Sequence, residues 1–355
     1  MYQRIYYLST KPDFFMKNNR WGFAMIGMGS ISHFHIKSIQ ELRNARLIAV
    51  CSANAQRAQE SGQQYQVPYY TNYKEMLKRP DIDIVCVCTI SGEHLGPTLA
   101  AAKHGKHIIT EKPLEVSLER ADLMIEACRR YGVKLACIFQ NRFRPTYIKM
   151  KQAISEGKIG KIVLANAYIK WYRDDQYYAS RNWRGTFWGD GGAALINQSI
   201  HTIDLLQDVM GPVSSVYGKV KTMTHDIEGE DLGLAILSFS NGAMGTIEGS
   251  TSIYPGYPER LEFHGAKGSI VYEGGEIVHW NVPDERIHTS SAAPDSGASD
   301  PLAIDYNNHK LQIQDMLEAL AEEREPLVNG EEGRKSLEII QAIYRSSKAQ
   351  KEVSL

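Results

Sequence analysis

Residues 23–35, FAMIGMGSISHFH, run from a short apolar segment through two glycines into a segment of helical character. Gly27 permits a tight turn, and Gly29 lets the backbone approach a ligand closely. A pyrophosphate can rest on the N-terminus of the helix that follows, where backbone N–H groups point outward. Ser32 stands where a small residue is favoured, and it fits less well there than glycine or alanine. The stretch predicts a dinucleotide site contacted by Gly27, Gly29, Ser30 and Ile31.

The sequence after this turn alternates apolar runs with amphipathic stretches. Strands are expected at 23–26, 47–51, 83–88, 107–110 and 134–139, and helices at 33–43, 55–65, 73–78, 96–104 and 118–131. Strands that are apolar throughout are buried on both faces, which is typical of parallel sheets. Residues 21–140 are therefore expected to form an α/β Rossmann domain with a doubly wound parallel sheet.

The remainder has a different pattern. Strands are expected at 162–171, 215–222, 231–239, 243–250, 259–264 and 269–272, and helices at 147–156, 193–210, 309–323 and 330–349. Residues 141–355 are expected to form an α+β domain with a mainly antiparallel open sheet, which binds substrate and forms oligomers. Residues 1–20 are expected to be a loose N-terminal extension, and residues 284–301 a mobile surface loop.

Composition excludes several classes of protein. The chain has 355 residues, with 40 basic and 41 acidic side chains and a net charge of −1, so a nucleic-acid partner is not expected. No apolar run reaches the ~18 residues of a membrane span, and the N-terminus lacks a signal peptide. The five cysteines lie in apolar stretches without a C-x-x-C pair. These features predict a cytoplasmic protein with reduced thiols.

The end of the second strand bears on the cofactor. An acidic residue there normally binds the ribose hydroxyls of NAD, but this strand ends in Cys51-Ser52-Ala53-Asn54. Ser52 and Asn54 can hydrogen-bond a 2′-phosphate, and Arg57 can neutralise it. The pattern favours NADP over NAD and leaves both open. Because ligands bind at the carboxyl edge of such a sheet, further cofactor contacts are expected at Thr89, Ser91, His94, Glu111, Lys112 and Gln140.

Two motifs carry candidate catalytic groups. Lys112 follows the fourth strand, where its ammonium can hydrogen-bond a substrate oxygen and stabilise alkoxide charge. Asn197 and His201 are four residues apart, so on an α-helix they share one face. Histidine titrates near neutrality and can accept a hydroxyl proton. Asp204 follows three residues later and is expected to orient the imidazole.

The segment 168–188 is rich in aromatic residues and arginine. Aromatic rings pack on the apolar faces of sugars, and arginine binds carboxylates or phosphates through two hydrogen bonds. The expected substrate contacts are Arg142, Tyr147, Tyr172, Arg173, Arg184, Asn197 and His201. No metal site is expected, because His33-x-His35 has no carboxylate cluster near it in the sequence.

The ordered motifs resemble those of the Gfo/Idh/MocA family of NAD(P)-dependent oxidoreductases. They are the Gly27 loop, Glu111-Lys112-Pro113, Gln140-Asn-Arg142, Gly157-x-Ile159-Gly160, Gly191-Gly-x-x-x-x-Asn197-x-x-x-His201-x-x-Asp204 and Glu325-Pro-Leu-Val-x-Gly330-x-Glu332-Gly333. The resemblance implies a Rossmann domain, an open sheet used in oligomers, and catalysis by Lys112 and His201.

Asn197 stands where many members of that family carry Asp. Together with Trp183-Arg184-Gly185-Thr186, it is similar to the subgroup that oxidises the 3-hydroxyl of UDP-N-acetyl-glucosaminuronic acid. The expected function is oxidation of a ring hydroxyl, at C3 in that subgroup, of a sugar, sugar acid, nucleotide sugar or cyclitol, with His201 as base and Asn197 and Lys112 beside it. Two alternatives stay open: a glycoside-cleaving enzyme that forms a transient 3-keto intermediate on bound NAD, and a non-catalytic sugar or NAD(P) sensor. The expected assembly is a homodimer or homotetramer.

Overall fold

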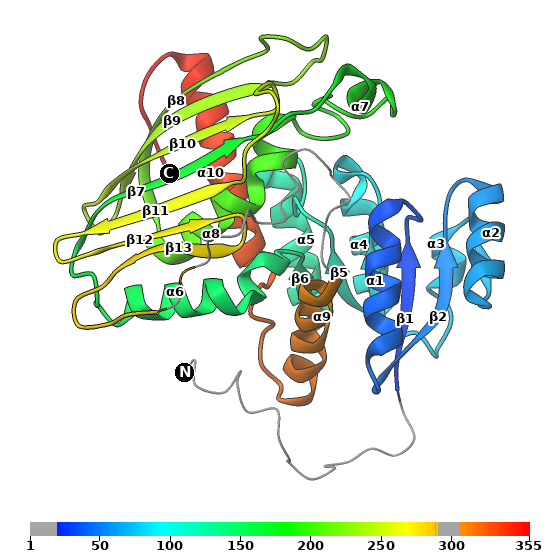
Figure 1. The fold of residues 1–355 in the computed structure, drawn as a ribbon. Helices are drawn as coiled ribbons and strands as arrows, with labels where there is room; N and C mark the ends of the chain where they lie inside the picture. The colour runs from blue at the N-terminus through cyan, green and yellow to red at the C-terminus, as the bar shows by residue number, and fades with distance from the viewer. Residues whose placement is uncertain (1–19, 288, 290–305) are drawn as a thin grey trace.

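A computed structural model describes residues 20–287, 289 and 306–355, and these residues form two β-sheets with helices packed on them (Figure 1). The predicted N-terminal extension, apart from Arg20, and most of the predicted loop at 284–301 lie outside the described residues.

The first sheet has six parallel strands in the order β3-β2-β1-β4-β5-β6. This order is that of a doubly wound nucleotide-binding fold, which confirms the predicted class. The strands are β1 (Trp21–Ile26), β2 (Ala45–Cys51), β3 (Tyr69–Tyr70), β4 (Ile84–Val87), β5 (His107–Thr110) and β6 (Leu135–Cys137). The helices between them are α1 (Ser30–Glu41), α2 (Ala55–Tyr65), α3 (Tyr73–Met76), α4 (Leu95–Lys103) and α5 (Leu118–Tyr131), with a 3₁₀ turn, η1 (Ser91–Glu93), before α4.

Both faces of the first sheet are buried. Val85 and Val87 belong to one apolar cluster, whereas Ile84 and Cys86, which alternate with them on β4, belong to another. All four side chains have no exposed surface. Continuous burial explains why the strands read as unbroken apolar runs.

The second sheet has eight strands in the order β13-β12-β11-β7-β10-β9-β8-β14. Only β7 and β10 pair in parallel, so the prediction of a mainly antiparallel sheet is confirmed. The strands are β7 (Ile162–Lys170), β8 (Val213–Lys221), β9 (Leu232–Phe239), β10 (Met244–Ser250), β11 (Arg260–Gly265), β12 (Ser269–Glu273), β13 (Glu276–Asn281) and β14 (Val353–Ser354).

Helices cover one face of the second sheet. They are α6 (Pro145–Ser155), α8 (Ile200–Met210) and α10 (Gly330–Ala349), and a short η2 (Gln140–Phe143) precedes α6. The opposite face carries the exposed apolar side chains of Tyr217, Leu234, Ile236 and Met244, which we call the open face. One small helix, α7 (Asp175–Ala179), lies in the loop after β7 (Figure 1).

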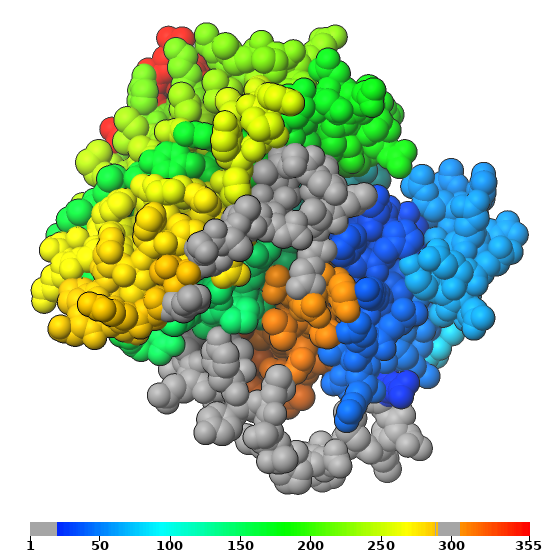
Figure 2. Space-filling view, in the orientation of Figure 1, coloured from blue at the N-terminus to red at the C-terminus, as the bar shows by residue number. Residues whose placement is uncertain are grey.

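Helix α9 (Tyr306–Ala321) returns the chain to the first sheet. Ile313, Met316 and Leu317 pack in the same apolar cluster as Phe23 and Ile36, so α9 lies against α1. Figure 2 shows α9 in orange between the blue nucleotide-binding part and the yellow sheet. Helix α10 contacts both α5 and β8 and so joins the two parts a second time.

No helix in the described part of the chain has the length and apolar character needed to cross a membrane. All five cysteines are buried free thiols, as their apolar surroundings in the sequence predict.

Candidate active site

The glycine turn lies between β1 and α1. Gly27 has φ +94°, and a Cβ there would stand 2.4 Å from the carbonyl oxygen of Cys88, so the turn requires glycine. A Cβ on Gly29 would meet nothing within 4 Å. Ser32 is buried, and its hydroxyl donates to the Gly29 carbonyl at 2.6 Å, which explains how serine fits the third position.

The turn opens onto a cavity of about 430 Å³. It is lined by Met28, Gly29, Ser30, His33, Phe34, Arg57 and Arg181. Helix α1 begins at Ser30 with no side chain capping it, so no side chain blocks the approach of a ligand to its N-terminus. Two arginines and a helix N-terminus make the cavity suited to an anionic group such as a pyrophosphate.

The polar end of β2 has a role in folding. Asn54 accepts a hydrogen bond from the Arg57 N–H at 2.8 Å and so caps α2, and the Ser52 hydroxyl accepts from the Asn54 N–H at 3.3 Å. These two oxygens are engaged within the protein. Of the three residues predicted to bind the cofactor at this strand end, Arg57 is the one that lines the cavity.

The remaining predicted cofactor residues lie at the ends of β4, β5 and β6. Thr89 and Ser91 belong to the loop that contains η1, and Gln140 is a buried residue of η2. His94 is fully buried, with Nδ1 3.0 Å from the Pro113 carbonyl and Nε2 3.2 Å from the Thr89 carbonyl. His94 thus joins the loop after β4 to the turn after β5, and its contact with the cofactor stays a prediction.

Lys112 reaches across to the second part of the chain. It directly follows Glu111 after β5, and the Lys112–Pro113 peptide bond is cis. Its Nζ donates to the backbone carbonyl of Asn197 at 2.7 Å. Burial lowers the pKa of Lys112, while the carboxylates of Glu111 and Asp190 act in the opposite direction. An ammonium with two further N–H groups is thus held at the carboxyl edge of the first sheet.

The predicted single helix over 193–210 is wrong in its first turns. The chain forms a π-helix at η3 (Ala194–Ser199) and becomes α-helical only in α8. Glu230 stabilises this start, because its carboxylate accepts from the Leu195 N–H at 2.7 Å, the Ala193 N–H at 3.2 Å and the Tyr344 hydroxyl at 2.9 Å. Asn197 and His201 therefore lie on either side of a π-to-α transition, and the spacing of one α-helical face does not apply.

The side chain of Asn197 binds Asp190. Its Nδ2 donates to Asp190 Oδ1 at 2.6 Å, and its Oδ1 accepts from Gln198 Nε2 at 2.5 Å. Burial raises the pKa of Asp190 to about 6. Sequence reasoning assigned no role to Asp190, although this carboxylate opens the glycine-rich motif that contains Asn197 and His201.

His201 lies at the start of α8 beside Phe139, with ring centroids 5.7 Å apart in an edge-to-face arrangement. Burial, followed by the nearby Lys112 ammonium, lowers the pKa of His201 to about 3, so the imidazole is neutral at physiological pH. The prediction that Asp204 orients this ring is wrong. Both Asp204 oxygens accept from Arg142, each at 2.7 Å.

Arg142 and Tyr147, which are predicted to contact substrate, are buried and bind other side chains of the protein. The Arg142 guanidinium also donates to Asp208 and Glu332, each at 3.0 Å. The Tyr147 hydroxyl donates to Asp208 at 2.5 Å, and the residue is 1% exposed. This ionic network joins η2, α6, α8 and α10, so its role is to hold the helices under the second sheet.

The aromatic segment after β7 contacts the π-helix directly. Arg173 is 3% exposed and donates to Gln198 Oε1 at 2.9 Å and to the Tyr172 carbonyl at 2.7 Å. Gln198 Nε2 donates to the Tyr177 hydroxyl at 2.8 Å, and the Arg184 guanidinium stacks 3.8 Å from the centre of the Tyr177 ring. Tyr177 and Gln198 were not predicted; they lie within the segments that the sequence marked.

Tyr172 belongs to this network through its backbone carbonyl, which accepts from Arg173. Its ring packs edge-to-face on that of Tyr254 at 5.2 Å, and Tyr254 is 77% exposed. The two rings form an aromatic edge beside the arginines, on which an apolar ligand face can pack.

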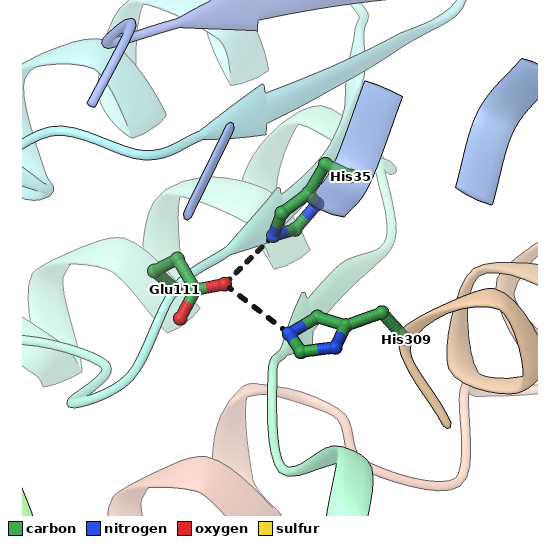
Figure 3. Close-up of side chains that lie close together, drawn as sticks. All are labelled: His35, Glu111 and His309. Atoms are coloured by element: carbon green, nitrogen blue, oxygen red, sulfur yellow. Dashed lines mark hydrogen bonds and ion pairs between the residues drawn. The ribbon is translucent and has the colours of Figure 1, made fainter. Parts of the chain in front are cut away.

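His35 has a carboxylate beside it, which the sequence did not predict. Its Nε2 lies 2.7 Å from Glu111 Oε1, and His309 approaches the same oxygen at 4.0 Å (Figure 3). One ligand atom from each of the three residues lies within 4.8 Å of the others, a donor set that divalent metals accept.

Comparisons with known proteins agree with this architecture. Residues 21–139 match the oxidoreductase family with an NAD-binding Rossmann fold, and residues 147–271 match the GFO/IDH/MocA C-terminal domain. The chain is 31% identical to the uncharacterized oxidoreductase YrbE of Bacillus subtilis over 69% of its own length and 72% of that protein. It is 26% identical to myo-inositol 2-dehydrogenase of Thermotoga maritima over 94% and 98% of the two chains.

A solved structure extends the likeness over almost the whole chain. The WlbA dehydrogenase from Bordetella pertussis, in complex with NADH and UDP-GlcNAcA, is 30% identical, with a TM-score of 0.85 over 95% of this chain and 99% of that one. The family models match the parts of the chain that hold the two sheets, and the chain belongs to the Gfo/Idh/MocA family of NAD(P)-dependent oxidoreductases.

Proposed function

We propose that the protein oxidises a ring hydroxyl of a sugar or cyclitol and passes the hydride to NAD. The observation that carries this proposal is the hydrogen bond from Lys112 Nζ to the Asn197 carbonyl, which brings the ammonium to the segment that carries His201. A proton donor from the first sheet and a neutral imidazole from the second part thus lie at one edge of the nucleotide-binding fold.

Different residues of the chain bind the cofactor, position the substrate hydroxyl and accept its proton. The Gly27 turn and the uncapped start of α1 bind the pyrophosphate. Lys112 donates a hydrogen bond to the substrate hydroxyl oxygen and stabilises the charge that develops there. His201, neutral because it is buried, accepts the hydroxyl proton. Nicotinamide, when bound, supplies the hydride acceptor.

The substrate we propose is a nucleotide-linked sugar acid. The 30% identical WlbA dehydrogenase was crystallised with UDP-GlcNAcA, and the segment with Arg173, Arg184 and Tyr177 offers this chain cations and an aromatic face beside the π-helix. Guanidinium groups suit both the carboxylate and the diphosphate of such a ligand. Asn197 would then position Asp190 and Gln198 around the substrate.

The cofactor we propose is NAD rather than the NADP that the end of β2 favoured. The WlbA dehydrogenase contains NADH, and Ser52 and Asn54 use their oxygens to stabilise the start of α2. Arg57 is the remaining feature that suits a 2′-phosphate. Kinetics with both cofactors test this choice: a higher kcat/KM with NADP would contradict it.

We also propose that the protein forms a homo-oligomer through the open face. Its proposed location is the cytoplasm. Tyr217, Leu234 and Ile236 expose apolar surface on neighbouring strands, and such a patch is typical of an interface.

The test is nicotinamide absorbance with a panel of free sugars, cyclitols and UDP-linked sugar acids. The expected result is reduction of NAD with one class and no release of the sugar from its glycosidic bond. Cleavage with tightly retained cofactor and no net nicotinamide turnover would favour the glycoside-cleaving alternative, and binding without either reaction would favour a sensor.

A further inference from the structure

Three elements that lie far apart in the sequence meet at one buried carboxylate. His35 comes from α1, Glu111 from the end of β5 and His309 from α9. All three are buried, at 0%, 6% and 1% exposure. Figure 3 shows both imidazoles directed at the same Glu111 oxygen. The Nε2 atoms of His35 and His309 lie 2.7 Å and 4.0 Å from it.

Electrostatics favour an ion pair in this cluster. Burial alone would raise the pKa of Glu111, but the hydrogen bond and charge of His35 lower it to about 2. Burial alone would lower the pKa of His35, but Cys88, Cys86 and Glu111 together raise it well above its ordinary value. An ionised carboxylate is thus stabilised in the interior by a protonated imidazole, because an unpaired buried charge would be very costly.

The second oxygen of Glu111 connects this cluster to the candidate catalytic group. Oε2 accepts from the backbone N–H of Lys112 at 3.2 Å, while Lys112 Nζ reaches Asn197 at 2.7 Å. The same α1 that supplies His35 begins at Ser30, beside the predicted pyrophosphate site. One carboxylate therefore joins α1, the turn that carries Lys112, and α9.

We propose that Glu111, held by His35 and His309, is a positioning residue that keeps Lys112 aimed at the substrate oxygen and protonated. The inference rests on the proposed function. Burial lowers the pKa of Lys112, whereas Glu111, Asp190 and Cys137 act in the opposite direction. Arg173 lowers this pKa further. Loss of the Glu111 charge should therefore remove one of the two carboxylates that favour the ammonium form of Lys112.

The test compares Glu111→Gln with a matched control, Glu115→Gln. Glu115 is also a buried carboxylate, four residues along the same loop, but it pairs with Arg120 at 2.6 Å and touches neither histidine. We expect Glu111→Gln to lower kcat at least ~10-fold and to leave the Kd for NADH within ~3-fold of wild type, while Glu115→Gln keeps both constants.

A second readout does not depend on turnover. Labelling of Lys112 by an amine reagent across pH, followed by peptide mass spectrometry, reports its titration. Glu111→Gln should move the midpoint down by about one pH unit, and Glu115→Gln should leave it in place. If no substrate is found for the wild type, the proposed function fails while this measurement still tests the role of Glu111.

The conservative variant His35→Gln retains a donor towards Glu111 without its charge, and it remains informative if Glu111→Gln does not fold. Because it removes the charge that stabilises the Glu111 carboxylate, it should lower kcat and the Lys112 midpoint in the same direction as Glu111→Gln, by smaller amounts. An unchanged kcat and midpoint in Glu111→Gln would overturn the proposal. So would a stoichiometric divalent metal in the purified protein that Glu111→Gln loses, since Glu111 would then be a ligand.

Discussion

At the scale of single residues, the two glycines of the turn have different roles: the backbone geometry requires Gly27, whereas Gly29 leaves space for a ligand. Gly27 has no room for a Cβ, whereas a Cβ on Gly29 would project into open space. Gly27→Ala should destabilise the fold by about 1–3 kcal/mol through its positive φ and its contact with Cys88. Gly29→Ala should keep the wild-type Tm and weaken NADH binding, because the methyl group occupies space needed by the pyrophosphate. Thermal unfolding and NADH titration of both variants check this contrast, and equal Tm values for the two would contradict it.

Arg142 provides a second test at this scale. Its guanidinium compensates Asp204, which is fully buried on α8. Arg142→Met should lower the free energy of unfolding by about 3–5 kcal/mol, because it leaves that carboxylate unpaired. Denaturant titration measures the loss. The double variant Arg142→Met, Asp204→Leu should recover part of it, and an undiminished loss in the double variant would argue against the pairing.

At the scale of secondary structure, the π-helix depends on a buried carboxylate. Burial raises the pKa of Glu230 to about 7 from its ordinary 4.5. Between these values the folded protein binds a proton that the unfolded chain has released, so this stabilisation is full below pH ~4.5 and is lost as the pH rises through ~7.

The glutamine side chain in Glu230→Gln is neutral at every pH, so this variant should not lose stability between pH 4.5 and 7 as the wild type does. The difference in unfolding free energy between wild type and Glu230→Gln should therefore change by on the order of 3 kcal/mol between pH 4.5 and 8. Denaturant titrations across this range give the difference. The exposed Glu60→Gln should show no such trend, and a pH-independent difference for Glu230→Gln would refute the account.

The elements that sequence reasoning missed have identifiable physical causes. Strand β3 is only Tyr69–Tyr70, too short for periodicity to reveal, and β14 is equally short. The π-helix follows from contacts with Glu230 and Tyr344, which are distant in the sequence. Long apolar strands and helices with strong signals, such as α2, α5 and α10, begin and end where predicted.

Some features of the candidate site could likewise be predicted from the sequence, and others could not. The glycine turn and the identity of Lys112 and His201 as candidates depend on local motifs, so they could be read from the sequence. The engagement of Asp204 with Arg142, and of Asn197 with Asp190, depends on how separate segments pack, so pattern alone did not predict it. The proximity of His309 to Glu111 could not be predicted for the same reason, because α9 packs against the first sheet nearly 200 residues after Glu111 in the chain.

At the scale of the whole molecule, the open face predicts assembly. Ile236 stands opposite Tyr217 on the neighbouring strand, and both are half exposed. Ile236→Lys should shift the sedimentation coefficient towards that of a monomer, because it places a charge in the centre of the apolar surface. The control Val163→Lys changes an exposed apolar residue near the start of β7, outside the open face, and should leave the assembly intact. If the wild type, Ile236→Lys and Val163→Lys all sediment identically, the open face is not the interface.

The meeting of Lys112 and His201 at one nicotinamide is the central claim, and the kinetics of two variants test it most directly. Lys112→Met and His201→Asn should each lower kcat for hydride transfer at least ~100-fold and keep the Kd for NADH within ~3-fold of wild type. Turnover at the wild-type rate in either variant, with the substrate that the wild type oxidises, would contradict the account.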